Sequence, residues 1–529
     1  MCMRVCLKIL LSVLCLSFGL PAFSEPGRFV VFFTDKDNNV YTLDAPEAFL
    51  SRKSIERRLR QGLSVDESDL PVTDAYVDAF AEAGCRVLCK SKWLNAVLLE
   101  SEDVDVEELA AGFPFVSSVS YVGTGTALNH RTPEYDNAFL DSPTDDVYGA
   151  LAGTLEIISA DYLHSKGFWG EGMTIAVLDD GFLNADLVDA GWGGNILGTK
   201  DFVNPENDDV YRMGQGHGMK VLSCMASNAD YVIKGVAPEA EYWLLRSEDD
   251  KEEPAEMYYM AAAIEFADSV GCDVINASLG YTAFDMPFSS LTYDDLDGTS
   301  DVSEVAGMAV DKGMVMVASA GNEGNKSWHY ITVPADAANV LAAGALSRGS
   351  YDDIASYSSR GPTSDSRVKP DVLAPGTVQV LTAAGRIVSG SGTSFASPLV
   401  AGSVACLWQA FPKTPAADVV RLLRETASDS GMPDNDGGYG TADFRKAFDV
   451  MKAGADGVSS CEIGYFMDDG MICLSGDGAE ENILSVYSLA GVCLLSSDTG
   501  CADVSSLPRG VYLLHINTGK SVIVRKIII

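Results

Sequence analysis

Short apolar runs alternate with helical patterns between residues 149 and 455, and this alternation limits the fold more than any other feature. Each run is four to six residues long, which suits a strand buried on both faces. The runs cover residues 173–178, 242–245, 273–276, 314–318 and 340–343. Helical patterns separate or follow them over residues 257–270, 302–312 and 416–426. We therefore predict an α/β region with a mostly parallel sheet and helices on both faces.

One serine stands where such a fold can support chemistry. Ser394 follows the small residues Gly390-Ser391-Gly392-Thr393, and an apolar helical pattern runs on from Leu399 to Trp408. Pro398 is tolerated only in the first turn of a helix, so the helix should begin close to Ser394. The N–H groups at a helix N-terminus attract negative charge, which makes Ser394 a candidate nucleophile. The same small residues also suit an ordinary tight turn.

Three polar residues upstream are candidate partners of this serine. Asp179 follows the run 173–178 and Asn322 follows the run 314–318, so both are expected at the carboxyl edge of the sheet. His217 stands between two glycines at a loop-to-helix junction. Serine hydrolysis needs a hydroxyl, a base and a carboxylate that fixes the imidazole tautomer. Taken alone, each residue also has a structural interpretation, as a turn former or a hydrogen-bonded histidine.

The order Asp179, His217, Ser394 distinguishes this set from two other folds that use the same chemistry. It differs from the chymotrypsin order, and Gly392-Thr393-Ser394-Phe395-Ala396 lacks the second glycine of the α/β-hydrolase turn. Asp, His and Ser in this order are typical of the subtilisin type.

Residues 149–455 resemble the catalytic domain of the subtilase family. The resemblance rests on seven blocks in the family's order: Ile175–Gly181, Gly216–Gly218, Val274–Gly280, Ala320–Gly324, Ser356–Pro362, Lys369–Gly376 and Gly392–Pro398. It implies that Ser394 attacks the scissile carbonyl, that His217 acts as general base and then acid, and that Asp179 orients His217. It also implies that Asn322 and the Ser394 N–H stabilise the oxyanion.

The resemblance also assigns the walls of the pocket for P1, the substrate residue before the scissile bond. These walls are Ser278, Leu279, Gly280, Ser319, Ala320 and Gly321. Both segments are small and apolar, so we expect a sizeable hydrophobic P1 side chain. Two residues depart from the family pattern, because Asp180 replaces the usual Ser or Thr and Met219 replaces the usual Thr. Neither change removes a catalytic group, and we expect Asp180 to point away from the site.

The flanking segments divide the chain further. Residues 1–24 have a positive start and a short apolar run, as in a secretory signal peptide. Residues 25–124 suggest a split βαβ unit of α+β type and resemble the inhibitory propeptides of secreted subtilases; an independent accessory domain is the alternative. The basic helix predicted over residues 48–63 is most simply a solvated face, or else it complements the acidic remainder. Residues 125–148 are turn-rich and polar, so we expect a linker that is cleaved during maturation.

The C-terminal segment, residues 456–529, changes to short β-like runs separated by Gly and Ser, as in a small β-sandwich-like domain. Residues 481–529 resemble the C-terminal sorting domain of type IX secretion in Bacteroidetes-like bacteria. A carbohydrate-binding or structural β module is the alternative. Four of the chain's twelve cysteines lie here, enough for two disulfides whose pairing the sequence leaves open.

Charge narrows the choice of partners. The net charge of −38 argues against nucleic acid or an anionic membrane surface as the main partner. Beyond the signal segment no apolar run is long enough for a transmembrane helix. Calcium is a candidate ligand by resemblance, since the loop Asn204–Asp209 is rich in oxygen atoms. The loop lacks a complete calcium-binding pattern, so a solvated loop is the preferred interpretation. No other cofactor is expected.

Together these features predict a secreted or cell-surface serine endopeptidase. Its expected partners are protein or peptide substrates, its own propeptide as an intramolecular inhibitor, and the secretion machinery. The alternative is a catalytically silent surface protein that binds peptides on the same fold.

Overall fold

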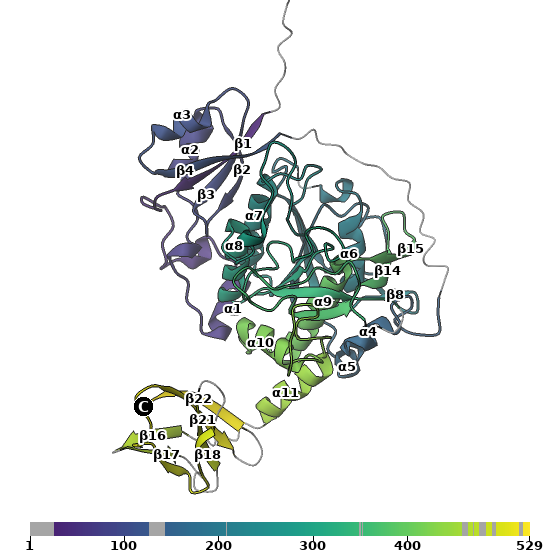
Figure 1. Ribbon diagram of the computed structural model, residues 1–529. Helices are drawn as coiled ribbons and strands as arrows, with labels where there is room; N and C mark the ends of the chain where they lie inside the picture. Colours follow the sequence, from purple (N-terminus) through teal and green to yellow (C-terminus); the bar gives the residue numbers. More distant parts are fainter. Residues whose placement is uncertain are drawn as a thin grey trace, which may run out of the picture. The chain divides into compact units, whose positions relative to one another are not determined.

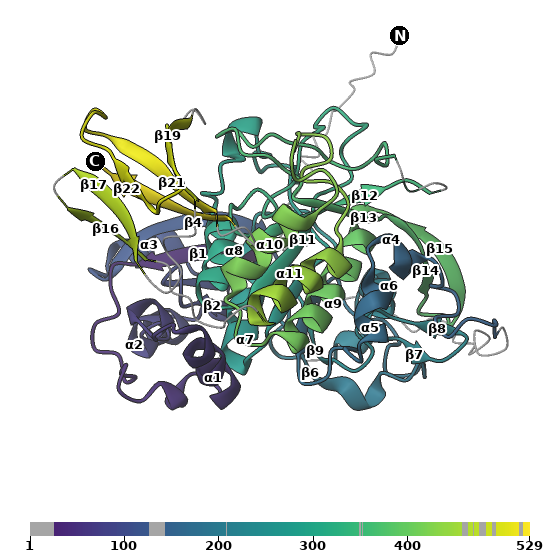
Figure 2. The same cartoon turned by 90° about the horizontal axis from the view of Figure 1, so that it is seen from below.

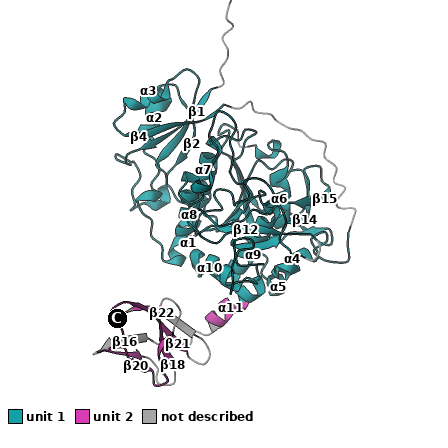
Figure 3. Ribbon diagram, viewed as in Figure 1, with its two compact units in different colours: residues 1–448 teal, residues 449–529 magenta. Residues whose placement is uncertain are grey.

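The computed structural model describes residues 26–125, 143–207, 209–348, 351, 353–456, 464–468, 470–475, 483–488, 493–517 and 522–529. The predicted signal peptide and most of the predicted linker lie outside the described residues. The chain divides into two compact units, residues 1–448 and 449–529 (Figure 3).

A seven-stranded sheet forms the centre of the first unit, and each pair of neighbouring strands is parallel. Its strands, in spatial order, are β13 (Val372–Pro375), β12 (Leu341–Leu346), β11 (Val315–Ser319), β10 (Val274–Ala277), β5 (Thr174–Asp179), β9 (Glu241–Arg246) and β6 (Ile196–Asp201). All five predicted apolar runs are strands of this sheet, which confirms the predicted α/β class. β5, β10, β11 and β12 are buried along their whole length, as continuous apolar runs require.

Helices cover both faces of this sheet (Figures 1 and 2). On one face α6 (His217–Ala226) packs against α9 (Thr393–Ala410), and on the other α7 (Ala255–Val270) packs against α8 (Asp301–Asp311). The remaining helices of this part are α4 (Thr154–Ile157), α5 (Ala160–Ser165), α10 (Ala416–Thr426) and α11 (Phe444–Asp456). α9 is buried from Thr393 to Trp408 because it is apolar on all sides. The hairpin of β14 (Thr377–Leu381) and β15 (Ile387–Ser391) leads directly into it, and β7 (Asn228–Ala229) pairs with β8 (Ile233–Lys234).

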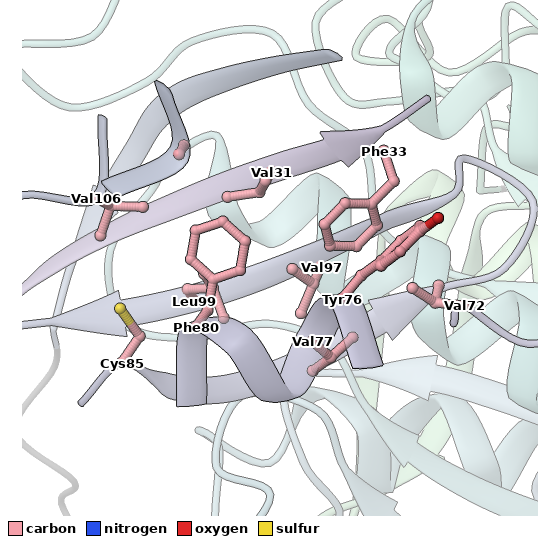
Figure 4. Packing of buried hydrophobic residues seen from close by; sticks show 11 residues of the cluster. Val31, Phe33, Val72, Tyr76, Val77, Phe80, Cys85, Val97, Leu99 and Val106 are labelled. Carbon is pink, nitrogen blue, oxygen red and sulfur yellow. The ribbon is translucent and has the colours of Figure 1, made fainter. Parts of the chain in front are cut away.

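The N-terminal part of the first unit is a four-stranded antiparallel sheet with helices, in the order β2-β3-β1-β4. Its elements are β1 (Gly27–Phe33), α1 (Arg52–Gln61), α2 (Asp74–Glu82), β2 (Arg86–Ser91), β3 (Ala96–Ser101), α3 (Val106–Ala111) and β4 (Val116–Thr124). This is the predicted split βαβ arrangement. Figure 4 shows its core, where Phe33, Phe80 and Leu99 pack between α2 and the sheet.

The basic helix α1 is not the solvated face that its sequence suggests. The Ser51 hydroxyl accepts the Ser54 N–H at its start, and Gly62 ends it in the left-handed conformation. Arg57 and Arg58 are almost fully buried because both guanidinium groups pair with the Asp268 carboxylate of α7. The prediction that this helix is a solvated face is therefore wrong. The alternative prediction, that it complements the acidic remainder of the chain, is confirmed.

The C-terminal unit contains two antiparallel sheets. One has β16 (Gly464–Asp468), β17 (Met471–Ser475) and β20 (Cys501–Asp503), and the other has β19 (Cys493–Ser497), β18 (Ile483–Tyr487), β21 (Val511–Asn517) and β22 (Val522–Ile528). Ile472 of one sheet and Leu484 and Leu514 of the other share a single core. One disulfide joins Cys473 to Cys501, and Cys493 is a free thiol. Cys461, the fourth cysteine of the predicted two pairs, lies outside the described residues.

Candidate active site

Asp179 and His217 meet where a strand ends and a helix begins. Asp179 is the last residue of β5 and is fully buried, whereas His217 is the first residue of α6 and its side chain is 33% exposed. His217 Nδ1 lies 2.8 Å from Asp179 Oδ1, a separation that fits an Nδ1–H donating to the carboxylate. That hydrogen bond leaves Nε2 on the other edge of the ring as the atom able to accept a proton.

Glycine at position 218 permits this close approach of α6 to β5. A Cβ at Gly218 would stand 2.3 Å from the Gly181 carbonyl oxygen and 2.8 Å from the Asp179 Cβ. Backbone atoms cannot yield that much space, so any side chain here would push His217 away from its carboxylate. The Met219 side chain that follows is fully buried and does not line the cleft.

The charge around His217 favours its protonated form. Burial alone disfavours the imidazolium, but the Asp179 and Asp180 carboxylates outweigh it and raise the pKa of His217 to about 9. Asp180 does not point away from the site, contrary to the prediction from sequence. Its carboxylate accepts the Gln215 and Gly218 N–H groups at 2.7 and 3.3 Å. Burial, reinforced by the neighbouring Asp179, raises the pKa of Asp180 to about 7.

Ser394 is the second residue of α9, as its sequence predicts, but Pro398 lies in the second turn rather than the first. Because proline has no N–H, the helix leaves the Ser394 carbonyl without its usual i+4 donor. The Ser278 hydroxyl takes that place and donates to the Ser394 carbonyl oxygen at 2.9 Å. One wall of the predicted P1 pocket is thereby tied to the candidate nucleophile.

Asn322 is oriented by the same helix start. Its Oδ1 accepts the Thr393 N–H at 2.9 Å and the Thr393 hydroxyl at 3.2 Å. These two donors fix which end of the amide faces α9 and leave the Nδ2–H groups on the other side as donors.

A cleft of about 370 Å³ joins these groups. His217, Ser394 and Asn322 line it, together with five of the six predicted wall residues: Ser278, Leu279, Gly280, Ser319 and Gly321. Ala320 does not line the cleft, because its side chain is fully buried behind the wall. The family model for the subtilase family matches residues 170–441, about half of the chain.

The chain belongs to the subtilase family.

Curated relatives agree with this assignment. Subtilisin E of Bacillus subtilis (strain 168) is 30% identical over 356 residues, which is 66% of this chain and 80% of the relative. The subtilisin of Bacillus pumilus is 32% identical over 276 residues, or 51% of this chain and 89% of the relative. The thermostable alkaline protease of Halalkalibacterium halodurans is 29% identical over 282 residues, or 53% of this chain and 68% of the relative. This subtilase is therefore a serine endopeptidase, a class that needs no cofactor for catalysis.

Both flanking segments match families of their own. Residues 28–137 match the peptidase S8 propeptide domain of Bacteroidota, and residues 471–529 match the secretion system C-terminal sorting domain. The chain thus carries a propeptide and a type IX sorting domain, and it is a secreted or cell-surface protein. Among the residues that the structure describes, no helix is both long and apolar enough to cross a membrane.

Several cleft residues were not predicted from the sequence. They are the carboxylates Glu248, Asp249, Glu252 and Glu323, the cation Lys326 and the hydroxyl-bearing Thr282 and Thr332. The first three follow β9 directly, at the carboxyl edge of the sheet where α/β folds place their ligands. Their position just after an apolar strand is the sequence signal that could have predicted them. Lys326 offsets only one of these charges, because it pairs with Glu323 at 2.8 Å.

The propeptide contacts the acidic loop, residues 248–253, which follows β9 and supplies three of these carboxylates. The Thr124 N–H and hydroxyl, at the end of β4, both donate to the Glu253 carboxylate at 2.7 Å. The Lys251 ammonium donates to the Gly125 carbonyl oxygen at 3.2 Å. The last strand of the propeptide therefore ends on the loop that lines one side of the cleft.

Proposed function

We propose that this subtilase hydrolyses peptide bonds through Asp179, His217 and Ser394, with Asn322 as an oxyanion donor. The observation that carries the proposal is the 2.8 Å contact between His217 Nδ1 and Asp179 Oδ1 beside a cleft that also holds Ser394 and Asn322. Acyl transfer needs a hydroxyl, a base, a carboxylate that orients the base, and a donor for the oxyanion, and all four are found at this cleft.

Each group has a defined part in the reaction. The Ser394 oxygen bonds to the scissile carbonyl carbon while His217 Nε2 takes the hydroxyl proton, and Asp179 holds the ring with Nδ1 protonated. The carbonyl oxygen becomes an oxyanion, which the Asn322 Nδ2–H and the Ser394 N–H stabilise. His217 then returns the proton to the leaving amine as the C–N bond breaks. Water then attacks the acyl carbon with His217 again as the base, and the bond from that carbon to the Ser394 oxygen breaks, which restores the hydroxyl.

The walls of the cleft support a hydrophobic P1 side chain. Leu279, Gly280 and Gly321 present apolar surface next to Asn322, and the nearby Glu323 is already paired with Lys326. We therefore propose that the P1 residue is hydrophobic and that charged residues bind elsewhere in the cleft.

We further propose a division of the chain into a signal peptide (1–24), a propeptide (25–124), a linker (125–148), a peptidase domain (149–455) and a sorting domain (456–529). The contacts of Thr124 and Gly125 with the acidic loop support inhibition by the propeptide, since they hold its last strand beside the cleft. Release then requires a cut in the linker. The sorting domain is proposed to engage the secretion machinery.

The propeptide contacts two of the side-chain oxygen atoms in the loop predicted to bind calcium. Asn204 Oδ1 and Glu206 Oε1, two of the predicted oxygen donors, both accept hydrogen bonds from Arg86 of the propeptide. Among the described residues, no group of three or more His, Cys, Asp or Glu side chains is placed to hold a metal ion. No step of the proposed mechanism involves a metal.

A fluorophosphonate probe tests the proposal, because it labels only an activated serine. We expect the secreted wild-type chain to be labelled and to hydrolyse casein, and the Ser394→Ala variant to do neither. Strong labelling of Ser394→Ala would overturn the assignment of the nucleophile. A properly secreted and matured wild-type protein that is neither labelled nor active would instead favour a silent peptide-binding protein.

A further inference from the structure

Arg28, at the start of propeptide strand β1, reaches across to the peptidase domain. Its Nη1–H donates to Asp249 Oδ2 at 2.9 Å, and its guanidinium carbon lies 5.6 Å from the centre of the Tyr259 ring. Its Nε also lies 3.4 Å from Glu100 Oε2 of the propeptide itself. The side chains of Arg28 and Asp249 are only 4% and 1% exposed. The peptidase domain therefore supplies a carboxylate and an aromatic face to one buried guanidinium.

Contacts within the peptidase domain fix its half of this site. Asp249 Oδ1 accepts the Lys251 N–H at 2.8 Å, and the Asp249 N–H donates to Glu256 Oε1 at 2.9 Å. Because these bonds hold the residue by its backbone and by Oδ1, Oδ2 is left to face Arg28. The Tyr259 ring is held on the helix α7. A site whose groups are already in position loses little freedom when it binds a cation.

The departure of the propeptide would remove the Arg28 cation from a strongly acidic place. Glu248 and Glu252 belong to the same loop as Asp249, and Glu256 follows at the start of α7. Burial, reinforced by the neighbouring carboxylates, raises the pKa of Glu248 and of Glu256 well above the ordinary value. These surroundings disfavour further negative charge, so a new cation beside Asp249 would stabilise them.

The site adjoins the cleft on the side that is N-terminal to the scissile bond. Asp249 itself lines the cleft. Thr124 and Gly125 of the propeptide contact the same acidic loop, and the proposed cut follows them in the linker. A substrate that runs in this direction therefore passes the loop before it reaches Ser394. Arg28 lies on β1, beside the last propeptide strand β4 and not on it, so its site is separate from the path of that strand.

We propose that Asp249 and Tyr259 form a guanidinium site, which binds an arginine of the protein substrate N-terminal to the scissile bond once the propeptide has left. A guanidinium is planar, donates through several N–H groups and stacks on an aromatic ring, so this pair suits arginine better than lysine. The inference rests on the proposed function, and it adds a second recognition point at a distance from the hydrophobic P1 residue.

The test uses the mature, secreted enzyme and peptides that contain one scissile bond. A single arginine is placed in turn at each position from the second to the ninth residue before that bond. Matched peptides carry lysine there, or citrulline, which has the shape of arginine without its charge. We expect one position at which kcat/KM for arginine is about tenfold above that for citrulline and about threefold above that for lysine.

Two pairs of variants assign this preference to the site. Asp249→Asn should bring the arginine-to-citrulline ratio close to one. Asp250→Asn is its matched control, because Asp250 is the next residue of the loop and is exposed, so this variant should keep the ratio. Tyr259→Leu removes the ring and should lower the arginine-to-lysine ratio. Tyr259→Phe keeps the ring and should keep that ratio, since among the described residues Tyr259 Oη has no hydrogen-bond partner.

Equal rates for arginine and citrulline at every position in wild type would overturn the inference, and that comparison needs no variant. A preference for arginine that survives in Asp249→Asn, or that Asp250→Asn removes to the same extent, would also overturn it. An unchanged arginine-to-lysine ratio in Tyr259→Leu would overturn the part given to the ring. Fluorophosphonate labelling of Ser394 needs no arginine. A labelled enzyme that cleaves all these peptides equally therefore contradicts this inference and leaves the proposed function standing, whereas an unlabelled and inactive enzyme contradicts both.

Discussion

Arg57 of the propeptide helix α1 is fully buried against Asp268 near the end of the peptidase helix α7. Arg58 and Lys92, also from the propeptide, approach the same carboxylate at 2.9 and 2.8 Å. Burial alone would raise the pKa of Asp268, but these three cations outweigh it and hold that pKa well below its usual range. Asp268 lies near the C-terminal end of α7, and none of these four residues lines the cleft, so the contact joins propeptide to peptidase outside the candidate active site.

Removing this carboxylate should destabilise the uncleaved chain. Asp268→Asn leaves three cations facing a neutral group, and breaking a buried pair from one side costs about 3–5 kcal/mol. The measurement is the free energy of unfolding in urea, made on Ser394→Ala chains so that proteolysis does not interfere. Arg52→Ala is the matched control, because Arg52 is on α1, the helix that supplies Arg57 and Arg58, but its side chain is 91% exposed and its loss should change little. Equal effects of the two substitutions would contradict the role given to Asp268.

Activity and the stabilising effect of His217 should change in opposite directions with pH. The raised pKa means that His217 is charged, and cannot take the serine proton, until the pH passes about 9. We therefore expect kcat/KM to rise through that region. The stabilising pair of imidazolium and Asp179 is fully present below the ordinary pKa of 6.5 and is lost as the pH rises through about 9. A pH–rate profile that reaches its plateau near pH 6 would contradict this.

Asp180→Asn should move that profile toward lower pH. Removing one negative charge beside His217 disfavours the imidazolium, so its pKa falls and the base becomes neutral earlier, by ~1 pH unit. The readout is the acidic limb of kcat/KM against pH, which a purely structural role would leave in place. A shift to higher pH, or none, would show that Asp180 does not act through His217.

Asn322→Ala should lower kcat with little change in KM. The amide is expected to bind the oxyanion, which exists only after attack has begun, and losing one such donor costs about 10²–10³ in rate. Steady-state kinetics on one peptide measures both constants. Because Asn322 also accepts two hydrogen bonds from Thr393, the thermal midpoint of the variant serves as a control for local unfolding. A rise in KM alone would contradict a transition-state role.

The acidic loop should favour basic substrates. Glu252 is exposed on the cleft, so Glu252→Gln should lower kcat/KM about two- to fivefold for a peptide with lysines around the scissile bond. The loss should shrink at high salt, because exposed charges are screened. Glu425→Gln on α10 makes the same change in net charge away from the cleft and should have no effect. A salt-independent loss would point to a contact other than charge.

Local patterns were enough to predict five of the seven strands of the sheet and the ordered set of polar residues. Continuous apolar runs identified β5, β10, β11 and β12, and Asp179 and Asn322 followed two of them. The order of the blocks then supplied the family. What local patterns could not supply were contacts between distant segments, such as Thr332 against Gly280, and Arg57 against Asp268, more than two hundred residues away.

Asp180 was misjudged for a related reason. Its direction depends on the N–H groups of Gln215 and Gly218, on either side of His217, which donate to its carboxylate, and no local pattern encodes that arrangement. β6 was missed because only one of its six residues is fully buried, so it lacks an apolar run. Five of the six residues predicted to wall the P1 pocket line the cleft, and Ala320 does not, because its side chain is fully buried.

Because the contact between α1 and the peptidase domain is largely ionic, it determines which groups the peptidase surface would expose once the propeptide is removed. Departure of α1 would uncover Asp268 and Asp273 and the carbonyl groups that Arg57 and Gln61 now cap. Water can solvate each of these groups. Departure of α1 would therefore add carbonyl groups and negative charge to this part of the peptidase surface, and both are readily hydrated.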